Sequence, residues 1–254
     1  MADVKTTEST APSSRRTRLM VVTVVGIIMS LFHMYSGLAG SYSAMYQRSI
    51  HLAFALFLTF LVCPALSGKA KNKLVLVYDI FLAILSIVSN AYILMYYEEI
   101  SLTRMGIPNT LDVTMGAILV FLVLEAVRRT TASAIAPIAV VFVLYVLFGH
   151  HLGGMWGHRP YDFSRLIHQL YLTTDGVYGI VLGASANFIF LFILFPCFLQ
   201  ATNIGDVISD AALALMGSIR GGPAKVSIVS SSLFGMISGS GAANVAVDGA
   251  ITIP

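Results

Sequence analysis

The sequence predicts an all-α polytopic membrane protein with six transmembrane helices, an interfacial helix and a C-terminal re-entrant helical hairpin. Of the 254 residues, 57% are hydrophobic and only 11% are charged, whereas soluble globular domains carry about 25% charged residues. Apolar runs of roughly 20 residues, the length that spans a bilayer, recur along the chain. They are roughly Leu19–Leu38, Ile50–Leu66, Leu74–Tyr96, Val113–Val127, Ala132–Gly149 and Gly179–Leu199.

The first apolar run follows a basic segment, yet it is longer than the apolar region of a signal peptide, which has about 7–15 residues. We therefore expect an uncleaved span. Residues 1–18 are polar and rich in Ser and Thr, so they are expected to form a disordered tail. Cys63 and Cys197 lie in apolar runs and are interpreted as buried, inert thiols.

The distribution of Lys and Arg predicts the orientation. Of the 15 Lys and Arg residues, 11 lie in the N-terminal tail and in the loops on the same side of the predicted membrane, whereas the alternate loops hold only Arg48, Arg104, Arg159 and Arg165. Cytoplasmic loops carry an excess of Lys and Arg. The N-terminus is therefore predicted to be cytoplasmic.

The longest outside loop runs from His150 to Gly176. Its second half, FSRLIHQLYL, spaces apolar residues at helical intervals, which predicts a short helix in the membrane interface. Four histidines suggest a metal site, but their spacing is not that of a metal site and no Cys accompanies them. We therefore expect these histidines to contact a docked partner or solvent, and we expect no metal here. The histidines are His150, His151, His158 and His168.

After the sixth span, NIGDVISDAALALMGSIRGG predicts a helix with Asp206 and Asp210 on one side. The sequence GGP at 221–223 is expected to break it. A further apolar run, Val226–Ile237, then leads into a segment of small residues and a second apolar run, Val245–Ile253. Each run has about 10 residues, enough for roughly half a bilayer.

The segment between these runs, SGSGAAN, has low helix propensity at most of its positions. This pattern predicts a re-entrant hairpin over about 226–254 with an unwound tip, where secondary transporters place ion and substrate sites. A packing face of small residues between ordinary helices is the open alternative. The Na⁺ candidates are Ser238, Gly239, Ser240 and Asn244. The substrate-side or coupling candidates are Gly241, Asp248 and Asn187.

Other polar residues occur within the spans. Asp79 is an intramembrane carboxylate and so a functional candidate, unless it lies at the interface or pairs with a neighbouring span. Glu125 and Arg129 have i,i+4 spacing and are interpreted as an anchor at the inner end of the fourth span. Small or polar residues of the sixth span fit helix packing as well as ligand contact: Gly183, Ser185 and Asn187. No nucleotide-binding or hydrolase motif occurs, so an enzyme is not expected.

The run GGPAKVSIVSSSLFGMISGSGAANVAVDGAITIP resembles the large-permease motif of the tripartite ATP-independent periplasmic (TRAP) transporters. It is most similar to the fused permeases that work with TAXI-type binding proteins. Other stretches resemble the same family and occur in the family's order along the chain: PNTLDVTMGAILVFLVLEAVRRT, VFVLYVLFG, HQLYLTTDGVYGIVLGASANFIFLF and DAALALMGSIRGGPAK. The resemblance is strong from about Arg104 to Pro254 and weak through the first three spans.

The resemblance implies a four-helix small-permease-like domain at 19–130 and the beginning of a large-permease-like domain at 131–254. It implies a multi-pass protein of the bacterial inner membrane. The activity would be Na⁺-coupled uptake of a small organic anion, such as a carboxylate, delivered by a TAXI-type periplasmic solute-binding protein. Na⁺ is then the coupling ion, and no other cofactor and no nucleic acid is expected. Transport would be elevator-like, with the small-permease part in the scaffold.

The sequence departs from the family pattern at Gly241 and Ala242, where larger residues are more common, and at Asp248, where a small hydroxyl residue is more common. The resemblance also implies a second permease half after Pro254. We therefore expect a fragment or a truncated reading frame that needs the remainder of the large permease to transport. The alternative is a non-transporting membrane scaffold or accessory subunit, and the reading frame beyond Pro254 distinguishes the two.

Overall fold

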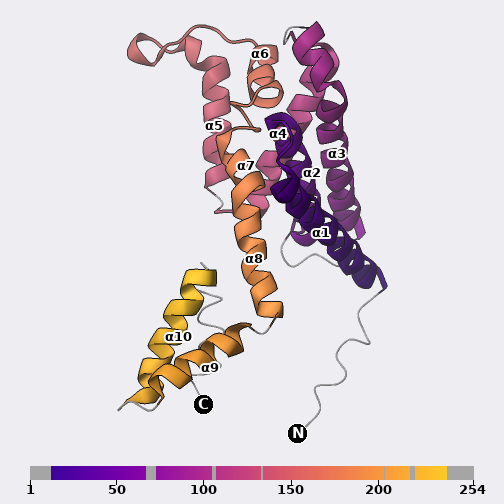
Figure 1. Ribbon diagram of the computed structural model, residues 1–254. Helices are drawn as coiled ribbons and strands as arrows, with labels where there is room; N and C mark the ends of the chain where they lie inside the picture. Colours follow the sequence, from indigo (N-terminus) through magenta and orange to yellow (C-terminus); the bar gives the residue numbers. More distant parts are fainter. Residues whose placement is uncertain are drawn as a thin grey trace. The chain divides into compact units, whose positions relative to one another are not determined.

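A computed structural model describes residues 13–66, 73–104, 107–132, 134–202, 204–217 and 221–238. Every regular element in these ranges is helical (Figure 1), which confirms the predicted all-α class for the described part of the chain. Contacts divide the chain into two compact units, Met1–Ala186 and Asn187–Pro254. Each unit is described by itself.

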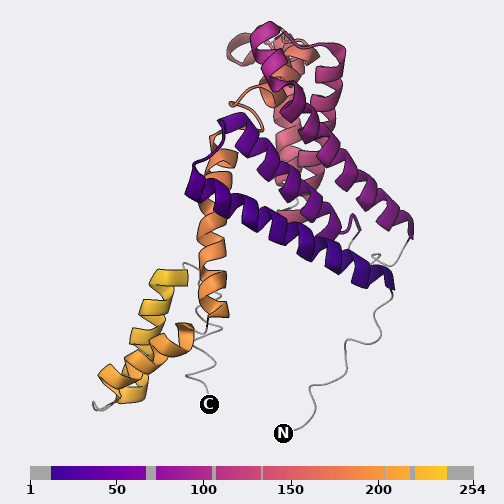
Figure 2. The same ribbon diagram turned by 45° about the vertical axis from the view of Figure 1, so that its right-hand side comes forward.

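The first unit begins with four long helices. Within the described residues, these four are long and apolar enough to cross a membrane. Figure 2 shows the first two as neighbouring antiparallel helices with a short connection between them. They are α1 (Ser13–Ala39), α2 (Ala44–Val62), α3 (Lys73–Glu98) and α4 (Thr110–Thr130).

The second helix lies earlier in the chain than predicted. The apolar run Ile50–Leu66 contains Pro64, and the residue before a proline is disfavoured in helical conformation. Cys63 is accordingly extended, with φ −102° and ψ 99°, and α2 ends at Val62. At its other end α2 extends back to Ala44. Arg48, expected in a loop, is therefore a helical residue.

A polar junction precedes α4. The π-helical turn η1 (Glu99–Thr103) continues α3. Asn109 then caps α4: its side chain accepts from the amide of Asp112 at 2.8 Å, and the Asp112 carboxylate accepts from the Asn109 amide at 2.7 Å. This capping box satisfies two amides that a helix start leaves unpaired. The same carboxylate also accepts from Arg104 at 2.5 Å and from the hydroxyl of Tyr92 at 2.6 Å.

The rest of the first unit is built from shorter helices. The predicted helix FSRLIHQLYL is confirmed, and its Leu166, Ile167 and Tyr171 are buried. It packs on α4 beside Gly116, where a methyl group would lie 2.9 Å from Cδ1 of Tyr171. Its position in a membrane interface stays a prediction. The elements are α5 (Ile135–Phe148), η2 (Gly149–His151), η3 (Gly154–Trp156), α6 (Phe163–Ile167), η4 (His168–Leu172) and α7 (Ile180–Ala184). The π-helical turn η5 (Ser185–Ile189) follows, and its first two residues end the first unit.

The predicted fifth and sixth spans are helical but shorter. Apolar helices cover Ile135–His151 and Ile180–Phe195, and both fall below the length of the first four. A bilayer-spanning helix needs about 20 residues. The number of six spans therefore stays a prediction, and so does the hairpin.

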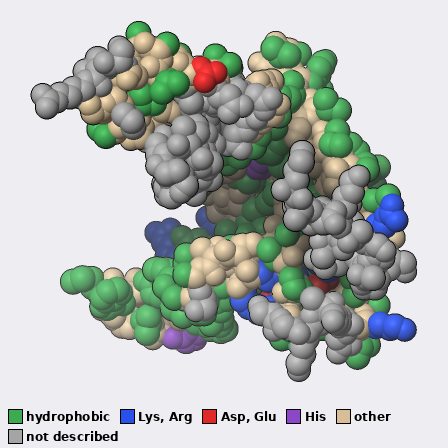
Figure 3. Space-filling view, turned by 90° about the horizontal axis from the view of Figure 1, so that it is seen from below, with side chains coloured by type: hydrophobic (Ala, Val, Ile, Leu, Met, Phe, Trp, Pro, Cys, Tyr) green, Lys and Arg blue, Asp and Glu red, His purple; other side chains and the backbone are tan. Residues whose placement is uncertain are grey.

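Buried apolar side chains gather between α2, α3 and α4, with Phe60, Leu82 and Leu119 at the centre. The outward faces of the same helices are also apolar, for example at Phe81 and Phe121. Hydrophobic side chains dominate the coloured surface in Figure 3, and charged ones are few. Helices that are apolar on all sides are typical of membrane spans.

The second unit contains α8 (Phe190–Ala201), α9 (Ile204–Met216) and α10 (Gly222–Ser238), and α9 packs beside α10. The predicted break at 221–223 is displaced: α9 ends at Met216, and Gly222–Pro223 begins α10 rather than ending a helix. Proline is favoured in the first helical turn because its missing N–H would be unpaired there anyway. Gly221 has φ +78°, a conformation suited to glycine.

Candidate functional site

The predicted hairpin tip is largely outside the described residues. Ser238 is the last residue of α10. Gly239, Ser240, Gly241, Asn244 and Asp248 lie in 239–254, beyond the described ranges. The Na⁺ and coupling roles of these residues therefore stay predictions.

Asn187 is the substrate-side or coupling candidate that lies within the described residues. It lies in the π-helical turn η5, and its Oδ1 atom is buried without a hydrogen-bond partner among the described residues. Single π-helical turns inside α-helices occur often at functional sites. A buried amide oxygen also costs free energy unless water or another group pairs with it.

A line of buried polar contacts joins α1, α2 and η5; we name it the polar seam. Nε2 of His33 lies 2.8 Å from Nδ1 of His51, and Nε2 of His51 lies 3.1 Å from Oγ of Ser185. At the other end, Nδ1 of His33 lies 2.7 Å from the carbonyl oxygen of Met29. The seam consists of His33, Ser36, Gln47, His51 and Ser185.

Two residues extend the seam toward the connection between α1 and α2. The Gln47 side-chain amide donates to Oγ of Ser36 at 3.1 Å, and the Ser36 hydroxyl donates to the carbonyl of His33 at 3.1 Å. Both side chains are buried. Polar residues within spans normally face the protein interior and pair with one another, and these follow that rule.

Arg48 links α2 to the segment before α7. Its Nη1 donates to the carbonyl of Tyr178 at 2.6 Å, and the Tyr178 hydroxyl donates to Oδ1 of Asn90 at 3.0 Å. The guanidinium lies against Gly183, where a methyl group would come within 2.7 Å of its Nε. Gly183 and Ser185 thus contact α2, so helix packing accounts for both residues.

A buried ion network lies elsewhere in the same helices. Arg129 donates to the Asp79 carboxylate at 2.7 Å, to Glu125 at 2.8 Å and to the carbonyl of Cys63 at 2.9 Å. Its guanidinium also lies 4.9 Å from the ring centroid of Phe60, a cation–π distance. The pairing alternative for Asp79 and the i,i+4 pair of Glu125 and Arg129 are both confirmed.

Both cysteines are free thiols, but the prediction that they are buried is wrong. Cys63 is half-buried and Cys197 is exposed. Apolar sequence does not separate the two environments, because in a membrane protein the lipid-facing side of a helix is as apolar as its core.

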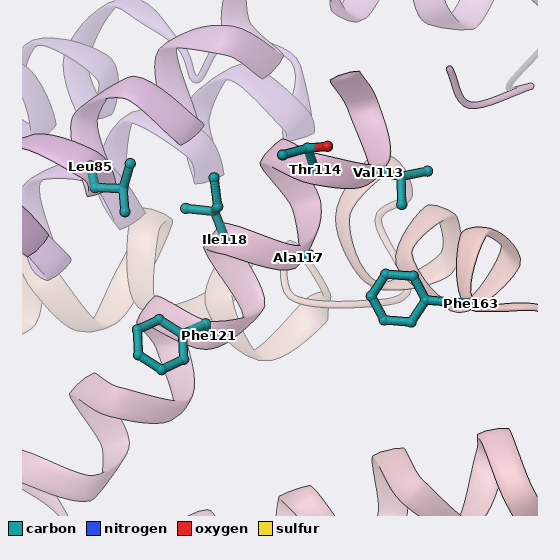
Figure 4. Close-up of a pocket in the computed structure, with 7 residues that line it drawn as sticks. All are labelled: Leu85, Val113, Thr114, Ala117, Ile118, Phe121 and Phe163. Atoms are coloured by element: carbon teal, nitrogen blue, oxygen red, sulfur yellow. The ribbon is translucent and has the colours of Figure 1, made fainter. Parts of the chain in front are cut away.

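An apolar groove runs along α4, with Leu85 of α3 and Phe163 of α6 at its edges (Figure 4). Thr114 is its only polar lining side chain, and the Thr114 hydroxyl donates to the carbonyl of Thr110 at 2.8 Å. A groove without a free polar group suits hydrocarbon rather than an anion. The lining residues are Leu85, Val113, Thr114, Ala117, Ile118, Phe121 and Phe163.

The histidine-rich loop after α5 is held by His158. Its Nδ1 lies 2.7 Å from the carbonyl oxygen of Arg159, and its Nε2 lies 2.9 Å from that of Tyr145. These two carbonyl contacts, first Arg159 and then Tyr145, raise the pKa of His158, because only the protonated ring can donate from both nitrogens. Within the described ranges, no three His, Cys, Asp or Glu side chains gather as metal ligands.

Comparison with known protein families matches residues 118–254 to the tripartite ATP-independent periplasmic transporter, DctM component. The match covers more than half of the chain. The chain belongs to the DctM family. Comparisons with curated proteins and with solved structures gave no match. Membership of a transporter family is consistent with the expectation of a non-enzyme.

In this DctM protein the polar seam connects residues inside the family match with residues before it. Ser185 lies in the segment that matches the family, whereas His33 and His51 lie before it. The seam therefore ties the N-terminal helices to the DctM part within the first unit. The match begins inside α4, and the domain boundary at 130/131 stays a prediction.

Proposed function

We propose that the chain is the membrane permease component of a Na⁺-coupled, binding-protein-dependent secondary transporter that takes up organic anions such as carboxylates. The single observation that carries this proposal is the DctM match over residues 118–254. Na⁺ coupling, the anionic substrate and a TAXI-type binding protein rest on the resemblance of the run at 221–254 to fused TRAP permeases. The proposed location is the bacterial inner membrane.

The proposed orientation places the N-terminus in the cytoplasm, because Lys and Arg are concentrated on that side of the spans. Reporter fusions after Lys73 and Arg129 should report the cytoplasm. Fusions near Glu99 and Gly157 should report the periplasm. A cytoplasmic signal at Gly157 would contradict the six-span topology.

The proposed Na⁺ site uses neutral oxygen ligands at the hairpin tip. Na⁺ is a hard cation, and backbone carbonyls, hydroxyls and amide oxygens suit it without burying another charge. Gly239 would supply backbone freedom, Ser240 and Asn244 side-chain oxygens. Ser238 completes the ion site, and Gly241, Asp248 and Asn187 are proposed for the substrate or coupling side.

Uptake into proteoliposomes tests this site, with the permease in its full reading frame and its purified binding protein. Gly239→Val should abolish Na⁺-dependent uptake while membrane insertion is kept, because a branched side chain distorts the carbonyls. Ser240→Ala should weaken the apparent Na⁺ affinity more mildly. Ser232→Ala is the matched control: the Ser232 hydroxyl is exposed and donates to Ile228 of its own helix. Unchanged Na⁺ dependence in the two tip variants would instead support a packing role for the small-residue segment.

A further inference from the structure

A cleft lies between α1 and α3, and α2, which packs against both helices, contributes to its lining. The cleft has a volume of about 500 Å³, and we name it the α1–α3 cleft. The N-terminal ends of α1 and α3 lie on the same side of the unit (Figure 2). The apolar walls are formed by Val21 of α1, Phe57 and Leu61 of α2, and Leu76, Ile80 and Ile84 of α3.

Two basic side chains lie at the end of the cleft where α1 and α3 begin. Arg18 lines the cleft, and its Nε donates to the carbonyl oxygen of Leu61 near the end of α2. This contact uses one of the five N–H donors of the guanidinium. Lys73 is exposed and lies one helical turn before Leu76, on the same face of α3. Among the residues that the structure describes, no carboxylate forms an ion pair with either cation.

The length of the cleft matches one leaflet of a bilayer. From Lys73 to Ile84 the distance along α3 is about 16 Å at 1.5 Å per residue, and one leaflet contributes roughly half of the 30 Å hydrocarbon core. The basic end lies on the side that the distribution of Lys and Arg predicts to be cytoplasmic. A ligand that fills the cleft therefore needs hydrocarbon along the walls and negative charge at the cytoplasmic end.

We propose that the α1–α3 cleft binds an anionic phospholipid of the cytoplasmic leaflet, with an acyl chain along the apolar walls and the phosphate at Arg18 and Lys73. Basic pockets between transmembrane helices on the cytoplasmic side suit anionic headgroups. A guanidinium suits a phosphate in particular, because its donors form a fork that two phosphate oxygens can accept. The lipid would fasten α1 to α3. The site is separate from the proposed Na⁺ site and does not depend on it.

The walls favour a lipid chain over a further helix. Helix contacts in membranes are enriched in small residues, which let two backbones approach closely. The walls of the cleft instead carry large or branched side chains, such as Phe57, Ile80 and Ile84. Ala83, a small lining residue, is already packed in the core. A flexible acyl chain can follow the uneven surface that the large side chains leave.

Native mass spectrometry of the purified full chain in detergent micelles measures lipid binding directly. The chain is titrated with dioleoyl phosphatidylglycerol and, in parallel, with dioleoyl phosphatidylcholine, which has the same acyl chains but no net charge. We expect phosphatidylglycerol to bind about tenfold more tightly, because two basic side chains face its negative headgroup. Glycerol phosphate, a headgroup without acyl chains, should not compete. Equal binding of the two lipids, no bound lipid, or competition by glycerol phosphate would overturn the proposal.

Charge variants locate the headgroup. Arg18→Gln should lower the affinity for phosphatidylglycerol about tenfold, because a charged hydrogen-bond donor is lost. It also removes the contact with Leu61, so Lys73→Gln, at an exposed position, is the second variant, with an expected loss of about fivefold. Arg128→Gln is the matched control: it removes one charge on the same predicted side, but Arg128 pairs with Glu125 and lies outside the cleft lining. Unchanged affinity in Lys73→Gln, or an equal loss in Arg128→Gln, would contradict the proposed headgroup position.

A filling variant locates the acyl chain. Val21 lines the cleft and is 39% exposed, so Val21→Trp should occupy the cleft and lower phosphatidylglycerol binding at least about tenfold. Unchanged binding in Val21→Trp would place the lipid elsewhere and overturn the proposal. Because no uptake is measured, failure here leaves the proposed transport function standing, and the reverse holds as well.

Discussion

Replacing Asp79 with alanine should destabilise the protein strongly, because it removes the α3 partner of the Arg129 guanidinium. Both side chains are 1% exposed, and their atoms are 2.7 Å apart. Removing one partner of a buried ion pair typically costs about 3–5 kcal/mol. Arg129 would keep Glu125 and the Cys63 carbonyl, so we expect the lower end of that range, about 3 kcal/mol.

The assay is unfolding of the purified protein in mixed micelles with increasing SDS, which yields the free energy of unfolding. Arg128→Ala is the matched control: Arg128 pairs with Glu125 but is 50% exposed, so its loss should cost about 0–1 kcal/mol. Asp79→Leu combined with Arg129→Met removes both charges and should recover most of the loss. An Asp79→Ala variant no less stable than Arg128→Ala would refute the reasoning.

Gly116→Val should destabilise by about 1–3 kcal/mol through overpacking against Tyr171, whereas Gly26→Ala, with open space around it, should be neutral in the same assay. Tyr178→Phe should cost about 1–3 kcal/mol because it leaves the buried Asn90 oxygen without its donor; a neutral result would mean that another group donates. The raised pKa of His158 predicts that the hydrogen bond from its ring to the Tyr145 carbonyl is fully formed below about pH 6.5. This hydrogen bond is lost as the pH rises through the raised pKa. Hydrogen exchange of residues 149–158 at pH 6 and pH 8 measures this, and a His158→Gln variant that keeps the pH dependence would contradict it.

Apolar runs were enough to predict the helices, since length and hydrophobicity are local properties. The end of α2 was missed because composition alone does not register Pro64: the helix ends at Val62, four residues before the predicted end at Leu66. Its start at Ala44 was missed because the apolar run begins only at Ile50, after Arg48. Asp79 could be predicted as a candidate because a carboxylate is unusual within an apolar run. Its partner, Arg129, lies 50 residues away and only tertiary packing brings them together.

The polar seam was not found from the sequence. His33 and His51 each lie in an apolar run, and the rule that singled out Asp79, a costly polar group within a span, would have found both. The contact of His51 with Ser185 crosses 134 residues, which no local pattern encodes. The π-helical turn that carries Ser185 also has no sequence signature.

The most direct test of the central claim is uptake of a labelled organic anion by the full-length permease in proteoliposomes. The four conditions combine an inward Na⁺ gradient, present or absent, with the purified binding protein, present or absent. A Na⁺-coupled, binding-protein-dependent permease predicts uptake only when both are present. Uptake that persists without the Na⁺ gradient or without the binding protein, or no uptake in any condition, would contradict it.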